Sequence, residues 1–258
     1  MAEACWLVGQ QYHYALIEAA KEQQLEAAAT EQHSRKMYGH VHIAKTGGSS
    51  LNSLFAYTFQ RVCGNKGHSY DIMNDFGSGS KPVWQTMVET GFVHCDYISQ
   101  EWASRLWYDT FVAGLGVQME LHVPCRDVID HFMSQCNHYG IRFPCDPNLS
   151  DGSLFTIVNA CIVRGRFDDF LLDQFDVKCF DFKKQFTVYM DHMSERLQPK
   201  ESYVSAPPHV RRDKTNECIW EDEILMAKVE NYLLKKYDYY RFCNRCMGSA
   251  DEITRDKD

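Results

Sequence analysis

The sequence has no long apolar run and no excess of positive charge, and both absences restrict what the chain can do. No segment reaches the roughly 20 apolar residues of a membrane-spanning helix. The first ten residues also lack the basic start and apolar core of a secretory signal. We therefore expect no membrane segment. Asp and Glu (35) outnumber Lys and Arg (27), for a formal net charge of −8. This balance argues against non-specific nucleic-acid binding, whereas a local cationic pocket for a nucleotide is compatible with it.

The eleven cysteines lack the dense spacing of a disulfide framework. Because their number is odd, at least one thiol cannot pair within the chain. Several lie in apolar stretches, where a free cysteine behaves as a small hydrophobic residue. We therefore expect reduced thiols and a cytoplasmic environment, with the Golgi lumen and a removed membrane anchor as the alternative. Cys243 and Cys246 form a lone CxxC without the second ligand pair that a zinc site needs, so no metal is predicted.

The composition is sufficient for one large α/β domain. Of the 258 residues, 45% are hydrophobic and 13% aromatic, enough to bury a substantial core. We expect an N-terminal helix within residues 1–37, the α/β domain over 38–242 and a C-terminal tail over 243–258. The helix would pack on the domain or on another copy of it, which makes a homodimer one option.

A short stretch between a predicted strand and a predicted helix has the chemistry of an anion cradle. Residues 38–44 have the pattern of a strand, and Leu51, Leu54 and Phe55 recur at helical spacing. Glycines let backbone amides approach a ligand, and a helix start supplies N–H donors and a positive dipole end. The candidate ligands in this 45–50 loop are Lys45, Thr46, Gly47, Gly48, Ser49 and Ser50.

A second polar group follows the strand predicted over 118–123. Arg126 and Asp127 come after this strand, and a helix is predicted over 128–139. Arg126 can fork onto a phosphate. Ser134 lies two turns into the helix and can reach the same group. In open α/β folds, ligands bind at the carboxyl ends of the strands, where both groups are expected.

These two groups, in this order, resemble the nucleotide-binding motifs of sulfotransferases that use 3′-phosphoadenosine 5′-phosphosulfate (PAPS). The loop is most similar to that of the Golgi carbohydrate sulfotransferases, which reads His-Ile-Pro-Lys-Thr-Gly-Gly-Thr-Ser; here Ala44 replaces the Pro and Ser49 the Thr. It is not a Walker A loop, in which the Lys follows the glycines. In the second motif, Val128 stands where the family usually has Pro, and His131 where it often has Arg.

The resemblance implies a P-loop-like parallel sheet flanked by helices, the sulfotransferase fold. It also implies transfer of a sulfuryl group from PAPS to a hydroxyl or amine of a carbohydrate or small molecule, releasing 3′,5′-ADP without a metal. The 45–50 loop would hold the 5′-phosphosulfate, with Lys45 offsetting charge in the transition state. Arg126 and Ser134 would hold the 3′-phosphate.

Two further segments are expected to supply the general base and a loop that covers the bound nucleotide. Residues 91–97 are interpreted as a short strand and its exit, where His94 is the candidate base. Asp96 and His68 are the reserves, near the acceptor substrate. The resemblance implies that a polar loop over 202–217 closes over the nucleotide. Its candidate ligands are Arg211, Arg212 and Lys214.

Two other functions stay open. A nucleotide-dependent phosphoryl-transfer enzyme would need magnesium and an acidic residue at a strand end, and the position of Lys45 argues against it. A non-catalytic module of the same fold would bind the nucleotide without turnover.

Overall fold

The computed structural model describes residues 36–64, 92, 95–101, 103–162, 167–200, 219 and 221–253, without the side chains of Ser49 and Ser53. The expected N-terminal helix lies outside these ranges. No helix in the described part combines the length and apolar character needed to cross a membrane.

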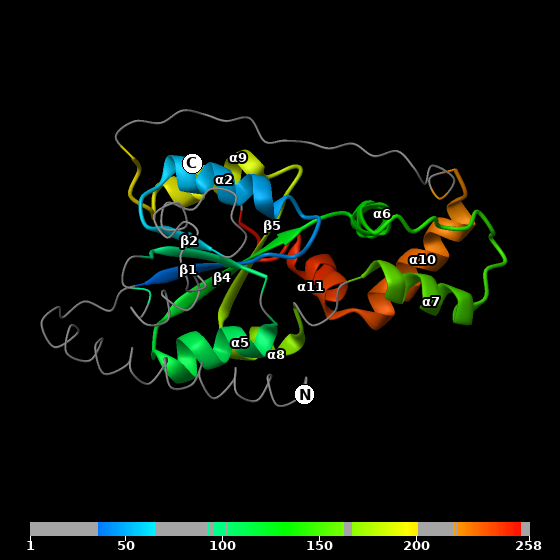
Figure 1. The fold of residues 1–258 in the computed structure, drawn as a ribbon, viewed down its shortest axis with the longest axis horizontal. Coiled ribbons are helices and arrows are strands. Elements are labelled where there is room, and N and C mark those ends of the chain that lie inside the picture. The colour runs from blue at the N-terminus through cyan, green and yellow to red at the C-terminus, as the bar shows by residue number, and fades with distance from the viewer. Residues whose placement is uncertain are drawn as a thin grey trace, which may run out of the picture.

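Five parallel strands form the central sheet (Figure 1). They are β1 (Met37–Val41), β2 (Val62–Gly64), β3 (Tyr97–Gln100), β4 (Met119–Cys125) and β5 (Asp176–Asp181). Their order is β2-β3-β1-β4-β5. Every residue of β1, β3 and β4 is buried, as expected for the centre of a parallel sheet covered on both faces. The predicted α/β fold with a parallel sheet is confirmed.

Helices cover both faces of the sheet (Figure 1). One face carries α2 (Gly48–Thr58) and α9 (Phe186–Ser194), whose rings Phe55 and Tyr189 pack in one cluster with Tyr97 of β3. The other face carries α5 (Ser104–Trp107), the π-helical η1 (Tyr108–Gly114) and α8 (Asp169–Gln174). There Trp107 and Leu171 join the larger core cluster. Because β-strand side chains alternate between faces, β1, β2 and β3 supply residues to both cores, whereas the apolar core residues of β4 all belong to the larger cluster.

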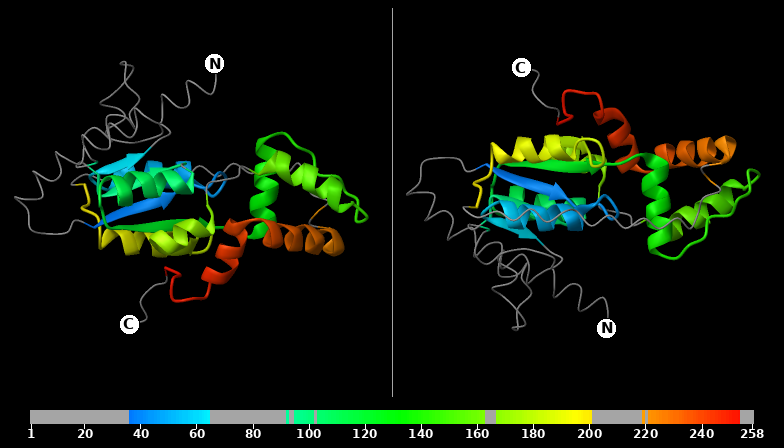
Figure 2. Two further views of the ribbon diagram at one scale, coloured as in Figure 1. Left: turned by 90° about the horizontal axis from the view of Figure 1, so that it is seen from below. Right: turned by 90° about the horizontal axis from the view of Figure 1, so that it is seen from above.

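A second group of helices lies beyond the carboxyl ends of the strands (Figure 2). It consists of α6 (Val128–His138), α7 (Asp151–Cys161), α10 (Glu223–Lys236) and α11 (Asp238–Cys246). The helix α6 begins directly after β4, where Asp127 is the N-cap and accepts a hydrogen bond of 2.9 Å from the Asp130 amide. The group therefore forms a wall next to the end of β4.

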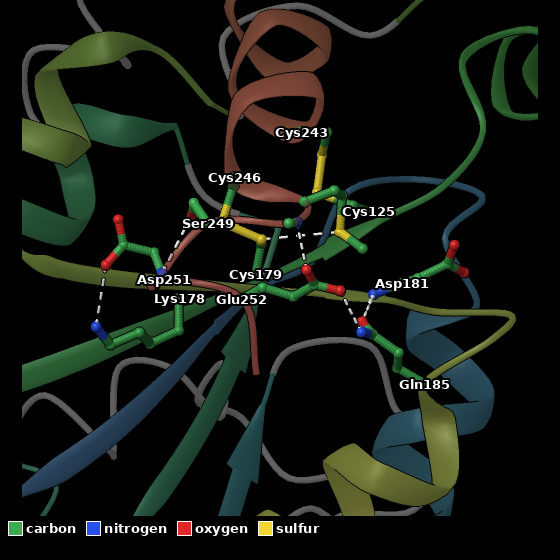
Figure 3. The surroundings of a disulfide bond; sticks show 12 residues. Cys125, Lys178, Cys179, Asp181, Gln185, Cys243, Cys246, Ser249, Asp251 and Glu252 are labelled. Carbon is green, nitrogen blue, oxygen red and sulfur yellow. Dashed lines mark hydrogen bonds and ion pairs between the residues drawn. A yellow bond between two sulfur atoms is a disulfide. The ribbon is translucent and has the colours of Figure 1, made fainter. Parts of the chain in front are cut away.

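The expectation of reduced thiols is wrong. Four disulfides join Cys63–Cys95, Cys125–Cys243, Cys136–Cys161 and Cys179–Cys246, and Cys145 is disulfide-bonded as well. The cysteines of the CxxC do not pair with each other: each joins α11 to a strand, β4 or β5 (Figure 3). The sequence spacing hid this arrangement because the partners are distant in the chain and adjacent only in the fold. The cytoplasmic expectation rested partly on free thiols, and the disulfides remove that ground.

Candidate functional site

The topology of the sheet marks β1 and β4 as the place for a ligand. From β1 the chain runs through α2 to β2 on one side of the sheet, whereas from β4 it runs through α6, α7 and α8 to β5 on the other side. Connections that diverge in this way leave a crevice at the carboxyl ends of the two strands, where open α/β sheets bind ligands. The 45–50 loop follows β1, and Arg126 follows β4.

The 45–50 loop is a tight turn into α2. Lys45 and Gly47 have positive φ angles of 69° and 76°. The first helical hydrogen bond runs from the Leu51 amide to the Gly47 carbonyl at 3.0 Å, so the amide of Gly48 has no acceptor within the helix. No acidic residue lies in the first turn of α2. The positive end of the helix dipole is therefore not offset by its own side chains.

Thr46 plays a structural part in this turn. Its buried hydroxyl donates to the Ile43 carbonyl at 2.7 Å. The hydroxyl therefore helps to close the loop, and nucleotide binding by Thr46 stays a prediction. The hydroxyl of Ser50 lies in the first turn of α2.

Packing requires both glycines of the loop. A Cβ atom on Gly47 would lie 1.7 Å from the Phe182 ring, and one on Gly48 would lie 2.1 Å from the His42 ring. Such distances are far inside van der Waals contact. Gly47 is additionally in the left-handed region, which favours glycine. The two rings thus support the loop from both sides.

Arg126 joins the two predicted motifs. Its Nη1 donates to the Lys45 carbonyl at 2.7 Å across 81 residues of sequence, and its Nε donates to the Asp130 carboxylate at 2.7 Å. The guanidinium is mostly buried, with 16% of the side chain exposed. Because the carbonyl belongs to the loop itself, the second motif is held directly against the first.

Lys183 is a cation of this site that the sequence analysis missed. It lies in the turn after β5, and its ammonium pairs with the same Asp130 carboxylate as Arg126. Burial raises the pKa of Asp130, but hydrogen bonds from Arg126 and Lys183 outweigh it, so the pKa is below its usual value. The carboxylate is therefore ionised and shared between two cations. The signal available in the sequence was a pair of adjacent lysines, Lys183 and Lys184, shortly after an apolar stretch.

His131 fixes the loop from the side of α6. The ring is fully buried, with Nε2 2.8 Å from the Ala44 carbonyl and Nδ1 3.0 Å from the Tyr240 hydroxyl. Burial lowers the pKa of His131 to about 4, although the bond to Ala44 opposes this shift. The neutral ring then donates from Nε2 to the carbonyl and accepts from Tyr240 at Nδ1. Where the resembled family often has an Arg, this chain has an uncharged support.

Ser134 lies one turn after Asp130 on α6 and is partly buried. Residues four apart share a helix face, so the Ser134 hydroxyl and the Asp130 carboxylate are on the same side of α6. This places Ser134 on the side of the helix that Arg126 contacts. The predicted helix is confirmed.

A cavity of about 780 Å³ adjoins the loop. Ile43 and His131 form the wall nearest the 45–50 loop. The remaining walls come from α6, α7, α10 and α11 and from residues between α7 and α8. Its lining is rich in aromatic rings: Phe155, Phe167, Tyr232, Tyr237, Tyr239 and Tyr240. Rings of this kind suit the flat face of a base or a sugar.

Asp96 does not belong to this site. Of the predicted strand at 91–97, the described residues Phe92, Cys95 and Asp96 are not in a strand. The strand is Tyr97–Gln100, so Asp96 precedes it. Tyr97 is paired with Tyr38 near the start of β1, which puts Asp96 at the opposite end of the sheet, where it pairs with Arg61 at 2.8 Å. The strand was predicted too early in the sequence because its last two residues, Ser99 and Gln100, are polar although they are buried.

The other predicted site residues lie outside the described residues: His68, His94, Arg211, Arg212 and Lys214.

The described residues do contain one acid–base pair at the carboxyl ends of the strands. His42 follows β1, and its Nε2 lies 3.7 Å from the Glu101 carboxylate after β3. The His42 ring is the one that packs on Gly48.

Comparisons of the chain with protein-family models, with curated proteins and with solved structures found no match.

Proposed function

We propose that this chain binds PAPS in the β1–β4 crevice and transfers its sulfuryl group to an acceptor hydroxyl or amine. The observation that carries the proposal is the hydrogen bond from Arg126 to the carbonyl of Lys45. Two anion-binding motifs that resemble those of one family are thereby adjacent at a topological switch point.

The 45–50 loop would take the 5′-phosphosulfate. Lys45 and the amides at the start of α2 offer positive charge to the oxygen that bridges phosphorus and sulfur. The acceptor oxygen forms a bond to sulfur as the bond between sulfur and the bridging oxygen breaks. The acceptor proton passes to a histidine base, for which His94 is the candidate, and 3′,5′-ADP leaves.

The 3′-phosphate would be held by Arg126, Ser134 and Lys183. A dianionic phosphate attracts Arg126 and Lys183 more strongly than the single charge of Asp130 does, so the two cations can turn from the carboxylate to the ligand. The aromatic cavity next to His131 would receive the adenosine. Its volume of about 780 Å³ is within the range of small-molecule sites.

The compartment we propose is the Golgi lumen. Disulfides persist in oxidising compartments and are rare in the cytosol, and this chain has four within its described residues. A luminal location would also give the enzyme access to carbohydrate acceptors.

Binding is tested first by thermal shift with 3′,5′-ADP, 2′,5′-ADP and AMP. We expect 3′,5′-ADP to stabilise the chain most, because only this nucleotide reaches both motifs. Equal shifts for 3′,5′-ADP and 2′,5′-ADP, which carry the same charge, would contradict a specific 3′-phosphate site. Lys184→Gln is the control for unspecific charge effects, since this lysine is 85% exposed.

Turnover is tested with radiolabelled PAPS across carbohydrates, small alcohols and amines. Label transfer that is lost in Lys45→Gln supports the sulfotransferase. Binding of 3′,5′-ADP with no transfer to any acceptor indicates the non-catalytic module. Magnesium-dependent use of ATP instead of PAPS indicates phosphoryl transfer.

A further inference from the structure

A cluster of three metal-ligating side chains lies on the sheet face covered by α9. Glu120 and His122 are two residues apart on β4, so their side chains share one face of the sheet. His192 comes from α9, which packs on this face. The ligating atoms of the three side chains all lie within 4.8 Å of one another.

We propose that Glu120, His122 and His192 bind a divalent transition-metal ion of the zinc type. Zinc binds histidine nitrogen and carboxylate oxygen at about 2.0–2.2 Å, so ligand atoms around one ion lie about 3–4 Å apart. The His122 Nε2 and Glu120 Oε1 atoms are already 2.8 Å apart. Only a small movement of His192 is needed to complete three protein ligands, with a fourth position for water.

Hydrogen bonds from neighbouring side chains orient His122 and Glu120 toward each other. The Tyr189 hydroxyl holds the His122 Nδ1 at 2.9 Å, and the Lys36 ammonium holds the Glu120 Oε2 at 2.8 Å. Nε2 and Oε1 are thereby left facing each other. Partners on the non-ligating atom are the usual way in which proteins orient metal-binding histidines and carboxylates.

The donor set selects the class of ion. Two imidazoles and one carboxylate suit zinc, cobalt or iron(II), whereas magnesium and calcium prefer oxygen ligands alone. The site is buried, since His122 is 0% exposed. It also lies near the amino end of β4, at the other end of the strand from Arg126. The ion would therefore fasten α9 to the sheet and have no contact with the nucleotide.

A hydrogen bond between Glu120 and His122 without any ion is the competing explanation. In that explanation His192 is a ring in edge contact with His122, at a centroid distance of 5.9 Å, and binds no ion. The two explanations predict different metal contents, so the choice can be measured.

The test uses the tag-free full chain, stripped with a chelator and dialysed against Zn²⁺ or Co²⁺. We expect one ion per chain by elemental analysis, visible absorption bands for the Co²⁺ form and a higher melting temperature with Zn²⁺. His192→Gln and Glu120→Gln should each lose the ion, while circular dichroism confirms that they fold. His138→Gln, which removes an exposed histidine at the end of α6, should bind as the wild type does.

No ion in the wild-type chain, or equal binding by wild type and a folded His192→Gln, would overturn the proposal. If Glu120→Gln fails to fold, His192→Gln decides alone, because His192 is only partly buried. The result is independent of the proposed function, since the thermal shift with 3′,5′-ADP is read at the other end of the sheet.

Discussion

The two ends of β4 are built in opposite ways. At the carboxyl end, Arg126 donates to the carbonyl of Lys45, and the adjoining helix start has no acidic residue in its first turn. Near the amino end, Glu120, His122 and Tyr189 are hydrogen-bonded to one another and buried. Substitutions at the first end should therefore change ligand binding and turnover, whereas substitutions at the second should change the stability of the fold.

The largest effect is expected for Lys45→Gln. Removing the charge that offsets the leaving oxygen should lower turnover of PAPS by about 10²- to 10³-fold. The melting temperature should stay close to that of wild type, because the glutamine keeps most of the length of the side chain. Steady-state kinetics and a thermal melt measure the two quantities. If Lys45→Gln lost much stability but kept its turnover, the assignment of ligand binding to the carboxyl end of β4 would be contradicted.

The disulfide next to Arg126 is the main exception to this contrast, since it ties the carboxyl end to α11. Replacing both partners in Cys125→Ser/Cys243→Ser opens a loop with a sequence separation of 118. We expect a loss of about 2–4 kcal/mol in the free energy of unfolding, measured by urea denaturation. The Cys136→Ser/Cys161→Ser pair, with a separation of 25, should lose less. The reverse ranking would show that chain entropy does not dominate.

His131 should make the loop end sensitive to acid. Its pKa is lowered to about 4 in the folded chain, from an ordinary value of 6.5. Between these values the unfolded chain binds the proton and the folded chain does not, so stability falls as the pH drops from about 6.5 to 4. The loss attributable to His131 is about 3 kcal/mol. Urea denaturation at several pH values gives the free energy of unfolding as a function of pH. This free energy should fall less steeply with acid in His131→Gln than in wild type. Part of the slope should remain, because burial also lowers the pKa of His40.

The smallest effect is expected for Tyr189→Phe near the amino end. The variant removes the hydroxyl that contacts His122 and keeps the ring that stacks on Phe180 at 3.8 Å. Leaving one buried nitrogen without this partner should reduce stability by about 1–3 kcal/mol, with nucleotide affinity unchanged. Isothermal titration with 3′,5′-ADP and a urea melt give the two values. A weaker affinity at full stability would contradict the assignment of this end to the fold.

The sequence predicted the parallel sheet and the 45–50 loop because both depend on contiguous patterns. Glycines, a lysine and an apolar helix face stand next to one another in the chain. The partners of the loop from distant parts of the chain could not be predicted in this way. His131, which contacts Ala44, and Lys183, which pairs with Asp130, reach the site from separate elements, and the order of the strands brings them together.

Two wrong predictions, the position of the strand β3 and the reduced state of the cysteines, have a common physical cause. The strand β3 ends in Ser99 and Gln100, and the disulfides join residues in apolar stretches. In both cases burial was judged from hydrophobicity alone. Tertiary context decided otherwise, because a central strand of a parallel sheet is buried whatever its side chains are, and a buried cysteine beside another can be oxidised.

The central claim is that the Lys45 and Arg126 motifs hold opposite ends of one nucleotide. Isothermal titration of wild type and Arg126→Ala with 3′,5′-ADP and with AMP tests it most directly. We predict that wild type prefers 3′,5′-ADP by about 10- to 100-fold, the value of a charged hydrogen bond. Arg126→Ala should lose most of this preference, and Lys183 and Ser134 should retain the remainder. An undiminished preference for 3′,5′-ADP in a folded Arg126→Ala chain would contradict the claim.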